Sequence, residues 1–230
     1  MNGGSLVATT KDSWIWWHWV ATHWRPGVEF SIADATWQHV QLTAIAVAVG
    51  LVLSLPLGVL AWRFRRLETP VLGFAGILYT VPSLALFALL VPATGLTTLT
   101  AEIGLVSYTL LVIIRNVVAG LDAVPADVRE AAQGMGFSRT GQFLRIELPL
   151  ATPAIIAGVR IATVTTIGLV TVTALIGKGG LGQLIYDGLN RDFKTPLTVG
   201  AVLSVALAIV ADALLLGFQR LVTPWARRAR

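Results

Sequence analysis

The sequence predicts an all-α integral membrane protein with five crossings, and three observations predict it: composition, long apolar runs, and basic residues at the ends of those runs. Of its 230 residues, 55% are hydrophobic and 13% are charged, which is too apolar for one water-soluble domain of this size. The sequence contains no cysteine, which excludes disulfides, thiolate catalysis and cysteine metal sites.

An aromatic segment precedes the first apolar run. Lys11 and Asp12 are followed by WIWWHWVATHW at 14–24, without the small-residue cleavage site of a secretory signal. This run is too short to cross a bilayer, but its tryptophans suit the headgroup layer, where the ring is buried and the indole N–H stays hydrated. We therefore expect residues 1–38 to form an external segment with an interfacial anchor.

Five later stretches are long enough to span the hydrocarbon, which takes about 20 mostly apolar residues as a helix. They carry few charges, and their recurring small residues let helix backbones approach closely in lipid. We expect a transmembrane domain over 39–222, with crossings at about 39–62, 71–92, 102–121, 150–176 and 197–222.

The basic residues predict the orientation, because Lys and Arg in connections are retained on the cytoplasmic side. Ten fall on one side: Arg63, Arg65, Arg66, Arg129, Arg139, Arg145, Arg220, Arg227, Arg228 and Arg230. Five fall on the other: Lys11, Arg25, Lys178, Arg191 and Lys194. We expect the N-terminus outside and the C-terminus, with a basic tail at 223–230, inside. Membrane topology thus accounts for the net charge of +5, and no nucleic-acid partner is expected.

The longest connection on the basic side covers about 122–149. It reads LDAVPADVREAAQGMGFSRTGQFLRIELP from 121 to 149 and predicts a helix at about 125–135, since Pro125 suits a first turn. Gly136 permits a left-handed turn, and Ser138 can cap a second helix. The segment therefore predicts a helix, a glycine turn and another helix.

Seven residues of this connection keep the spacing EAA, three residues, G, nine residues, I-x-L-P. They are Glu130, Ala131, Ala132, Gly136, Ile146, Leu148 and Pro149. The pattern resembles the EAA loop of binding-protein-dependent ABC importer permeases. The resemblance implies a five-span type I permease core in a bacterial cytoplasmic (inner) membrane, whose loop docks on a separate ATPase subunit. The alternative is a plain surface hairpin between two spans.

Three further stretches resemble the osmoprotectant permeases, which import glycine betaine, carnitine, choline or related compounds. They are YTVPSLALFALLVPATG at 79–95, LLVIIRN at 110–116 and TVTALIGKGGLGQLIYDGL at 171–189. Methionine and other small-solute permeases share the EAA loop, so another small solute is an alternative substrate.

The same resemblance implies the partners: a second permease, identical or paralogous, a pair of ATP-binding subunits and an extracellular substrate-binding protein. GKGGLG at 177–182 lacks the spacing and context of a phosphate loop, so it is read as an outer turn. ATP and Mg are expected on the ATPase, and this chain is expected to bind no cofactor and to have no enzymatic activity. An ion-driven secondary carrier is the alternative, although no internal repeat supports it.

A few polar side chains lie inside the predicted spans. A charge in the bilayer usually faces protein or water, and Arg160 and Asp212 both lie about 15 Å from their cytoplasmic helix ends at a rise of about 1.5 Å per residue. We expect them to form an intramembrane pair, while Arg115 snorkels toward the inner face. Tyr79 and Tyr108 are candidates for the substrate path, because aromatic rings attract quaternary ammonium groups; helix packing is the alternative.

The three histidines do not predict a metal site. His18 and His23 belong to the aromatic segment, and His39 has no cysteine partner in the sequence. We read all three as ordinary interfacial residues.

Overall fold

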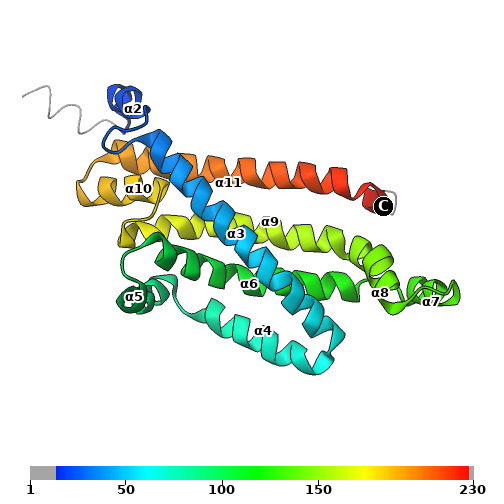
Figure 1. Ribbon diagram of the computed structural model, residues 1–230. Coiled ribbons are helices and arrows are strands. Elements are labelled where there is room, and N and C mark those ends of the chain that lie inside the picture. The colour runs from blue at the N-terminus through cyan, green and yellow to red at the C-terminus, as the bar shows by residue number, and fades with distance from the viewer. Residues whose placement is uncertain (1–13, 228–230) are drawn as a thin grey trace, which may run out of the picture. The chain divides into compact units, whose positions relative to one another are not determined.

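The computed structural model describes residues 14–227, and all the regular secondary structure in that range is helical (Figure 1). Lys11, Asp12, Arg228 and Arg230 lie outside the described residues, so parts of the predicted N-terminal segment and basic tail do as well. The chain divides into two compact units. Unit 1 comprises 14–45, Pro82–Leu105 and Thr165–Val210, and unit 2 comprises Ala46–Val81, Val106–Val164 and 211–227.

Four stretches among the described residues are long and apolar enough to cross a membrane, and a bent pair of helices makes a fifth if it counts as one span. The four are α3 (Ile32–Arg63), α6 (Thr98–Asp122), α11 (Lys194–Val222) and Arg139–Ile176, which contains α9 (Leu148–Val172). The bent pair is α4 (Arg65–Thr80) and α5 (Ser83–Thr94). The predicted all-helical membrane fold is confirmed.

The second predicted crossing, 71–92, is wrong as a single continuous helix. Helix α4 ends at Thr80 and α5 begins at Ser83, with Val81 and Pro82 extended between them at ψ 127° and 133°. A residue before proline is pushed out of the helical region, and proline lacks the N–H that the helix needs. The sequence Val-Pro therefore breaks this apolar run.

The first crossing starts earlier than predicted, at Ile32 instead of about residue 39. Ser31 Oγ accepts a hydrogen bond from the Asp34 N–H at 3.0 Å, which satisfies a free amide of the first turn. Asp34 itself suits the positive end of the helix dipole. A polar cap thus adds about two turns that hydropathy alone does not reveal.

The core of unit 2 is built around α6. Ile113, Val117 and Leu121 follow one helical face and pack on Ala151 and Ile155 of α9. A second face, with Leu111, Ile114 and Val118, packs on Ala61 of α3 and Ala75 of α4. Helix α6 is thus a central helix, with 56% of its most apolar stretch buried.

Unit 1 packs short helices against parts of the long ones. The short helices are α2 (Trp17–His23), within the aromatic segment, and α10 (Leu181–Asn190). Helix α10 follows the short 3-10 turn η2 (Thr173–Ile176). Trp19 of α2 packs with Ile32 of α3 and with Leu181 and Leu184 of α10. The predicted turn at 177–182 contains left-handed backbone at Gly177, φ +71°.

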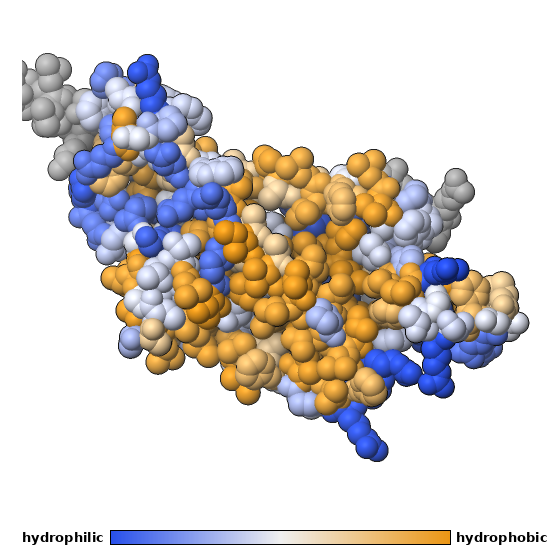
Figure 2. All heavy atoms as spheres, viewed as in Figure 1, coloured by the Kyte–Doolittle hydropathy of each residue, from blue (hydrophilic) through white to orange (hydrophobic). Residues whose placement is uncertain are grey.

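Helix α11 presents mostly apolar side chains on its surface, and only 11% of its most apolar stretch is buried. Its exposed residues include Val202, Val205, Ile209, Leu214, Phe218 and Leu221. Figure 2 shows apolar side chains over much of the visible surface. Such a helix requires a nonpolar environment such as lipid or another apolar surface.

We predict that Gly158→Ala destabilises the protein whereas Gly217→Ala does not. A Cβ at Gly158 of α9 would lie 2.5 Å from Asn116 Cβ of α6, whereas one at Gly217 of α11 meets no atom within 4 Å. Overpacking typically costs about 1–3 kcal/mol, while alanine itself favours a helix. Thermal unfolding of purified protein in lipid nanodiscs measures the difference. Equal melting temperatures for the two variants would contradict this packing.

Candidate functional site

The connection with the EAA spacing folds into two helices around a glycine turn, as predicted. Helix α7 (Ala126–Gly134) matches the helix expected at 125–135, and Gly136 has φ +78°. The Phe137 N–H donates to the Ala132 carbonyl at 3.1 Å across this turn. Ser138 then caps α8 (Arg139–Gln142) by accepting a hydrogen bond from the Gly141 N–H at 3.2 Å. We call residues 122–149 the EAA loop.

A π-helical turn, η1 (Phe143–Glu147), joins α8 directly to α9. Sequence reasoning missed it, because no residue type in FLRIE distinguishes a π-turn from an α-turn. Ile146 lies within this turn, and Leu148 and Pro149 begin α9. The helix runs continuously from Arg139 to Ile176, so Pro149, which has no N–H, interrupts the hydrogen-bond ladder directly after the π-turn.

The residues of the EAA pattern divide between an outer and an inner face of the loop. Glu130, Ala131 and Gly136 are exposed, whereas Ala132 is completely buried. Met135, beside Gly136, is 68% exposed. The outer face therefore offers a carboxylate, a small residue and a flexible apolar side chain to a partner, while Ala132 packs inside the chain.

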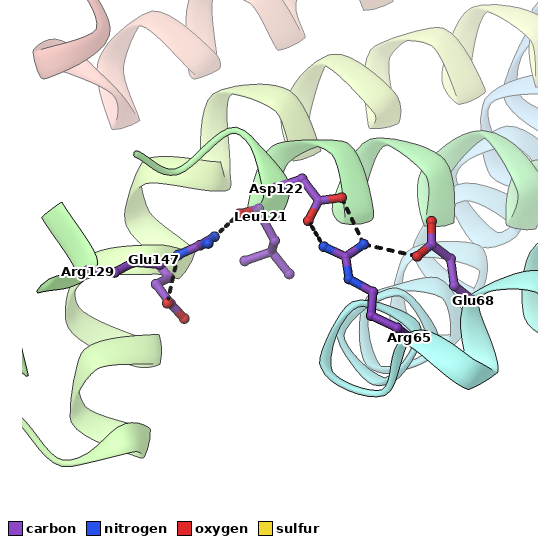
Figure 3. A network of polar contacts seen from close by, with 6 residues as sticks. All are labelled: Arg65, Glu68, Leu121, Asp122, Arg129 and Glu147. Carbon is purple, nitrogen blue, oxygen red and sulfur yellow. Dashed lines mark hydrogen bonds and ion pairs between the residues drawn. The ribbon is translucent and has the colours of Figure 1, made fainter. Parts of the chain in front are cut away.

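Arg129 directly precedes the pattern, and its guanidinium links α7 to Leu121 and Glu147 at neighbouring helix ends (Figure 3). Its Nη2 donates to the Leu121 carbonyl at 2.6 Å, and its Nε lies 3.2 Å from Glu147 Oε1. The guanidinium carbon also lies 5.6 Å from the centroid of the Trp62 ring. Gln142 Nε2 donates to the same Glu147 oxygen at 3.0 Å. We call these five residues the Arg129 cluster.

Sequence reasoning missed the Arg129 cluster. It counted Arg129 only as a topological charge and did not consider Glu147 at all. A usable signal was present, because Glu147 is an acid at the start of an apolar span and such a carboxylate needs a partner. The identity of that partner depends on the folded loop and was not readable from spacing.

A second ion-pair group in Figure 3 lies on the surface of unit 2. Arg65 of α4 contacts Asp122, at the end of α6, and lies 3.0 Å from Glu68. The Arg65 side chain is 59% exposed, whereas the Glu147 side chain is 7% exposed. Water therefore screens the Arg65 group far more than the Arg129–Glu147 pair.

The structure brings Arg160 and Asp212 together. Arg160 Nε and Nη2 each donate to one Asp212 oxygen at 2.9 Å, so α9 and α11 are joined by a bidentate pair. Gln219 adds to it by accepting from Arg160 Nη1 at 3.4 Å and donating to the Pro153 carbonyl at 3.1 Å. Arg115 is exposed on α6.

Tyr79 and Tyr108 also meet, with ring centroids 5.9 Å apart and nearly perpendicular planes. The Tyr108 hydroxyl donates to the Val81 carbonyl, at the break between α4 and α5. Tyr108 is buried, but Tyr79 is 41% exposed. Tyr108 thus supplies a hydrogen bond where the helix ladder is interrupted, and Tyr79 leaves part of its ring accessible.

The histidines occupy different environments. His23 stacks on Trp19 at 4.2 Å, and His18 is exposed. The interfacial reading of His39 is wrong, because this side chain is fully buried and its Nε2 lies 3.0 Å from the Ile167 carbonyl oxygen. Within residues 14–227, no three His, Asp or Glu side chains are grouped as metal ligands would be.

Long apolar helices joined by an exposed helix–turn–helix loop of this spacing define a permease subunit of a membrane importer. The chain belongs to the family described as "Binding-protein-dependent transport system inner membrane component", which matches residues 39–228. It is therefore the multi-pass inner-membrane permease of an ABC importer and not itself an enzyme, and the family implies ATPase and binding-protein partners. The predicted family and class of function are confirmed.

Similar proteins agree with this assignment. "Osmoprotectant import permease protein OsmW" of Salmonella typhimurium strain LT2 is 40% identical over 84% of this chain and 92% of that protein. "Glycine betaine/carnitine/choline transport system permease protein OpuCB" of Bacillus subtilis strain 168 is 38% identical over 82% of this chain and 87% of that protein. A solved chain of the MetNI methionine ABC transporter in an inward-facing conformation has the same fold, with 22% identity and a TM-score of 0.71 over 84% of this chain and 96% of that one.

We predict opposite effects for alanine at two glycines of the EAA loop. Gly136→Ala places a side chain at φ +78° and should destabilise the loop by about 1–2 kcal/mol. Gly134→Ala lies at the end of α7 with no atom within 4 Å and should stabilise that helix by up to about 1 kcal/mol. Hydrogen exchange of the α7 amides should therefore become faster in the first variant and slower in the second. Equal exchange would contradict the assigned turn.

Proposed function

We propose that this permease imports quaternary-ammonium osmoprotectants such as glycine betaine, carnitine or choline, and that its EAA loop docks on the ATPase. The observation that carries the docking role is the exposed face of the loop, where Glu130, Ala131 and Gly136 lie beside the exposed Met135. Glu130 can pair with basic groups of the ATPase, and the small residues permit close approach. Ile146, Leu148 and Pro149 would connect this docking face to α9.

The distribution of charge supports an orientation with the EAA loop in the cytoplasm. Twelve of the 17 Lys and Arg residues belong to the sequence segments of unit 2 and five to those of unit 1, with six acidic residues in each. Basic residues accumulate on the cytoplasmic side of membrane proteins. We therefore infer that the EAA loop and the C-terminus lie inside and the N-terminus outside.

The proposed complex contains more than one chain. We infer a second permease, identical or paralogous, a pair of ATPase subunits that bind ATP and Mg, and an extracellular binding protein that delivers the substrate. Closing of the ATPases on ATP would move both EAA loops and switch the spans between inward-open and outward-open states. The energy source would thus lie on a separate polypeptide.

The substrate class is proposed from the relatives whose printed names include glycine betaine, carnitine or choline. One feature of this chain agrees with it, because the half-exposed ring of Tyr79, fixed by Tyr108, offers an aromatic face to a quaternary ammonium group. Methionine is the alternative, because a methionine transporter shares the fold.

Reconstitution in proteoliposomes tests the proposal. The permease, its ATPase and its binding protein should take up labelled glycine betaine, carnitine or choline in an ATP-dependent manner, and methionine should not be taken up. Uptake by the permease alone, driven by an ion gradient, would contradict the ATP-driven mechanism. Preferential uptake of methionine would contradict the substrate class.

The same liposomes test the docking role. Glu130→Ala should reduce uptake per ATP hydrolysed by about tenfold, a change typical of lost allosteric coupling. Asp127→Asn removes another exposed charge of α7, outside the EAA pattern, and serves as the control. Wild-type uptake with Glu130→Ala, or equal losses in both variants, would refute a specific role for Glu130.

We further propose that the Arg160–Asp212 pair fixes the packing of α9 on α11 and does not act as a gate. Asp212→Asn should lower the amount of folded permease in the membrane several-fold, the response expected of a stability defect. The charge-swapped double variant Arg160→Asp, Asp212→Arg should recover part of that amount. Quantitative immunoblotting of membranes measures it. A normal amount of the Asp212→Asn permease in the membrane, together with no gain of the double variant over Arg160→Asp alone, would contradict a packing role for the pair.

A further inference from the structure

We propose that Arg129 is a positioning residue that transmits the motion of α7 to the membrane-spanning helices through the Arg129 cluster. This inference rests on the proposed docking of the EAA loop, and it assigns the connection between the docked helix and the spans to one side chain. The guanidinium of Arg129 in α7 is directed toward Leu121 of α6 and Glu147 before α9 (Figure 3), and it also lies near Trp62 of α3.

The contact with α6 is a helix cap. A helix leaves its last carbonyl groups without intrahelical partners, and an arginine near this end can satisfy one of them. Arg129 Nη2 donates to the Leu121 carbonyl at 2.6 Å, in the last turn of α6. Leu121 is itself fully buried in the core of unit 2. A displacement of α7 therefore acts directly on the end of a central helix.

The contact with α3 is a cation–π contact. The guanidinium of Arg129 lies 5.6 Å from the centroid of Trp62, which is in the last turn of α3. The Trp62 ring lies 6.1 Å from the ring of Phe143, the first residue of η1. The planar guanidinium thus packs where the ends of α3 and the π-turn meet, and an ammonium group does not reproduce this geometry.

The contact with α9 is a buried ion pair. Glu147 is 7% exposed, and its Oε1 lies 3.2 Å from Arg129 Nε and accepts the amide of Gln142 at 3.0 Å. A buried carboxylate without a cation is strongly unfavourable, so this pair resists separation. Glu147 is the last residue of η1 and directly precedes α9. The pair therefore fastens α7 to the start of a spanning helix.

Unit 2 contains a natural control for this inference. The Arg65–Asp122 pair also joins helix ends, those of α4 and α6, but it involves no residue of α7 and its side chains are 59% and 38% exposed. Because water screens such a pair, its removal should change little. Comparing the two arginines separates transmission from any general effect of losing an ion pair.

The absence of cysteine from the chain allows a direct test. A single cysteine introduced at the exposed Gln133 of α7 reports docking by crosslinking to the ATPase of the full complex in liposomes. In this background, Arg129→Gln and Glu147→Gln should keep the crosslink and ATP hydrolysis but lower uptake per ATP hydrolysed by about tenfold. Arg129→Lys, which keeps the charge, should recover part of the uptake, and Arg65→Gln should match the parent.

Three results would overturn the inference. The first is a parental ratio of uptake to ATP hydrolysis in both Arg129→Gln and Glu147→Gln. The second is a loss of assembled protein in these variants with an unchanged ratio in the complexes that remain, because this would make the cluster purely structural. The third is a parent chain that transports but does not crosslink, because this would remove the proposed docking itself. The first two results leave the proposed docking intact, so the two failures are distinguishable.

Discussion

The absence of water from the hydrocarbon region constrains this structure more than any single contact. Every backbone N–H and C=O group there needs a protein partner, and an α-helix provides these partners within one segment. The break between α4 and α5 is the informative exception. Val81 and Pro82 leave the helical conformation, and the Tyr108 hydroxyl donates to the Val81 carbonyl at that point. The break is tolerated because a neighbouring helix supplies a hydrogen bond that the local backbone does not.

The charges described above are partnered in different ways. Arg160 and Asp212 satisfy each other with two hydrogen bonds, and Glu147 has both a guanidinium and an amide partner. Arg65 and Asp122, in contrast, remain accessible to water. The chain thus contains a bidentate pair, a largely buried pair and a water-exposed pair, and water screens the last of these most.

Much of the fold could be predicted because its signals are local. The apolar length of α6 and α11 and the Pro125 to Ser138 sequence of the EAA loop each depend on residues close in the chain. The early start of α3 was also readable, since Ser31 and Asp34 form a capping pattern, but the polar Gln38 and His39 obscured it. Attention to Val-Pro in an apolar run would have predicted the break after α4.

The rest of the site depends on contacts between distant residues. Between Arg129 and Glu147 lie the rest of α7, the glycine turn, α8 and most of η1, so their pairing follows from the folded loop and not from spacing. The pairing of Arg160 with Asp212 was predictable because charges within spans are few. The π-turn at 143–147 has no sequence signature of its own.

The early cap of α3 has a geometric consequence. A helix of 32 residues is about 48 Å long at about 1.5 Å per residue, whereas the hydrocarbon layer is about 30 Å thick. The helix must therefore tilt, project beyond the lipid tails, or do both. Its first turns carry Asp34 and Gln38, and the Gln38 side chain accepts a hydrogen bond from the Gly180 amide. Helix α3 therefore has length to spare for a connection outside the lipid tails, and its first turns hold the start of α10 through this hydrogen bond.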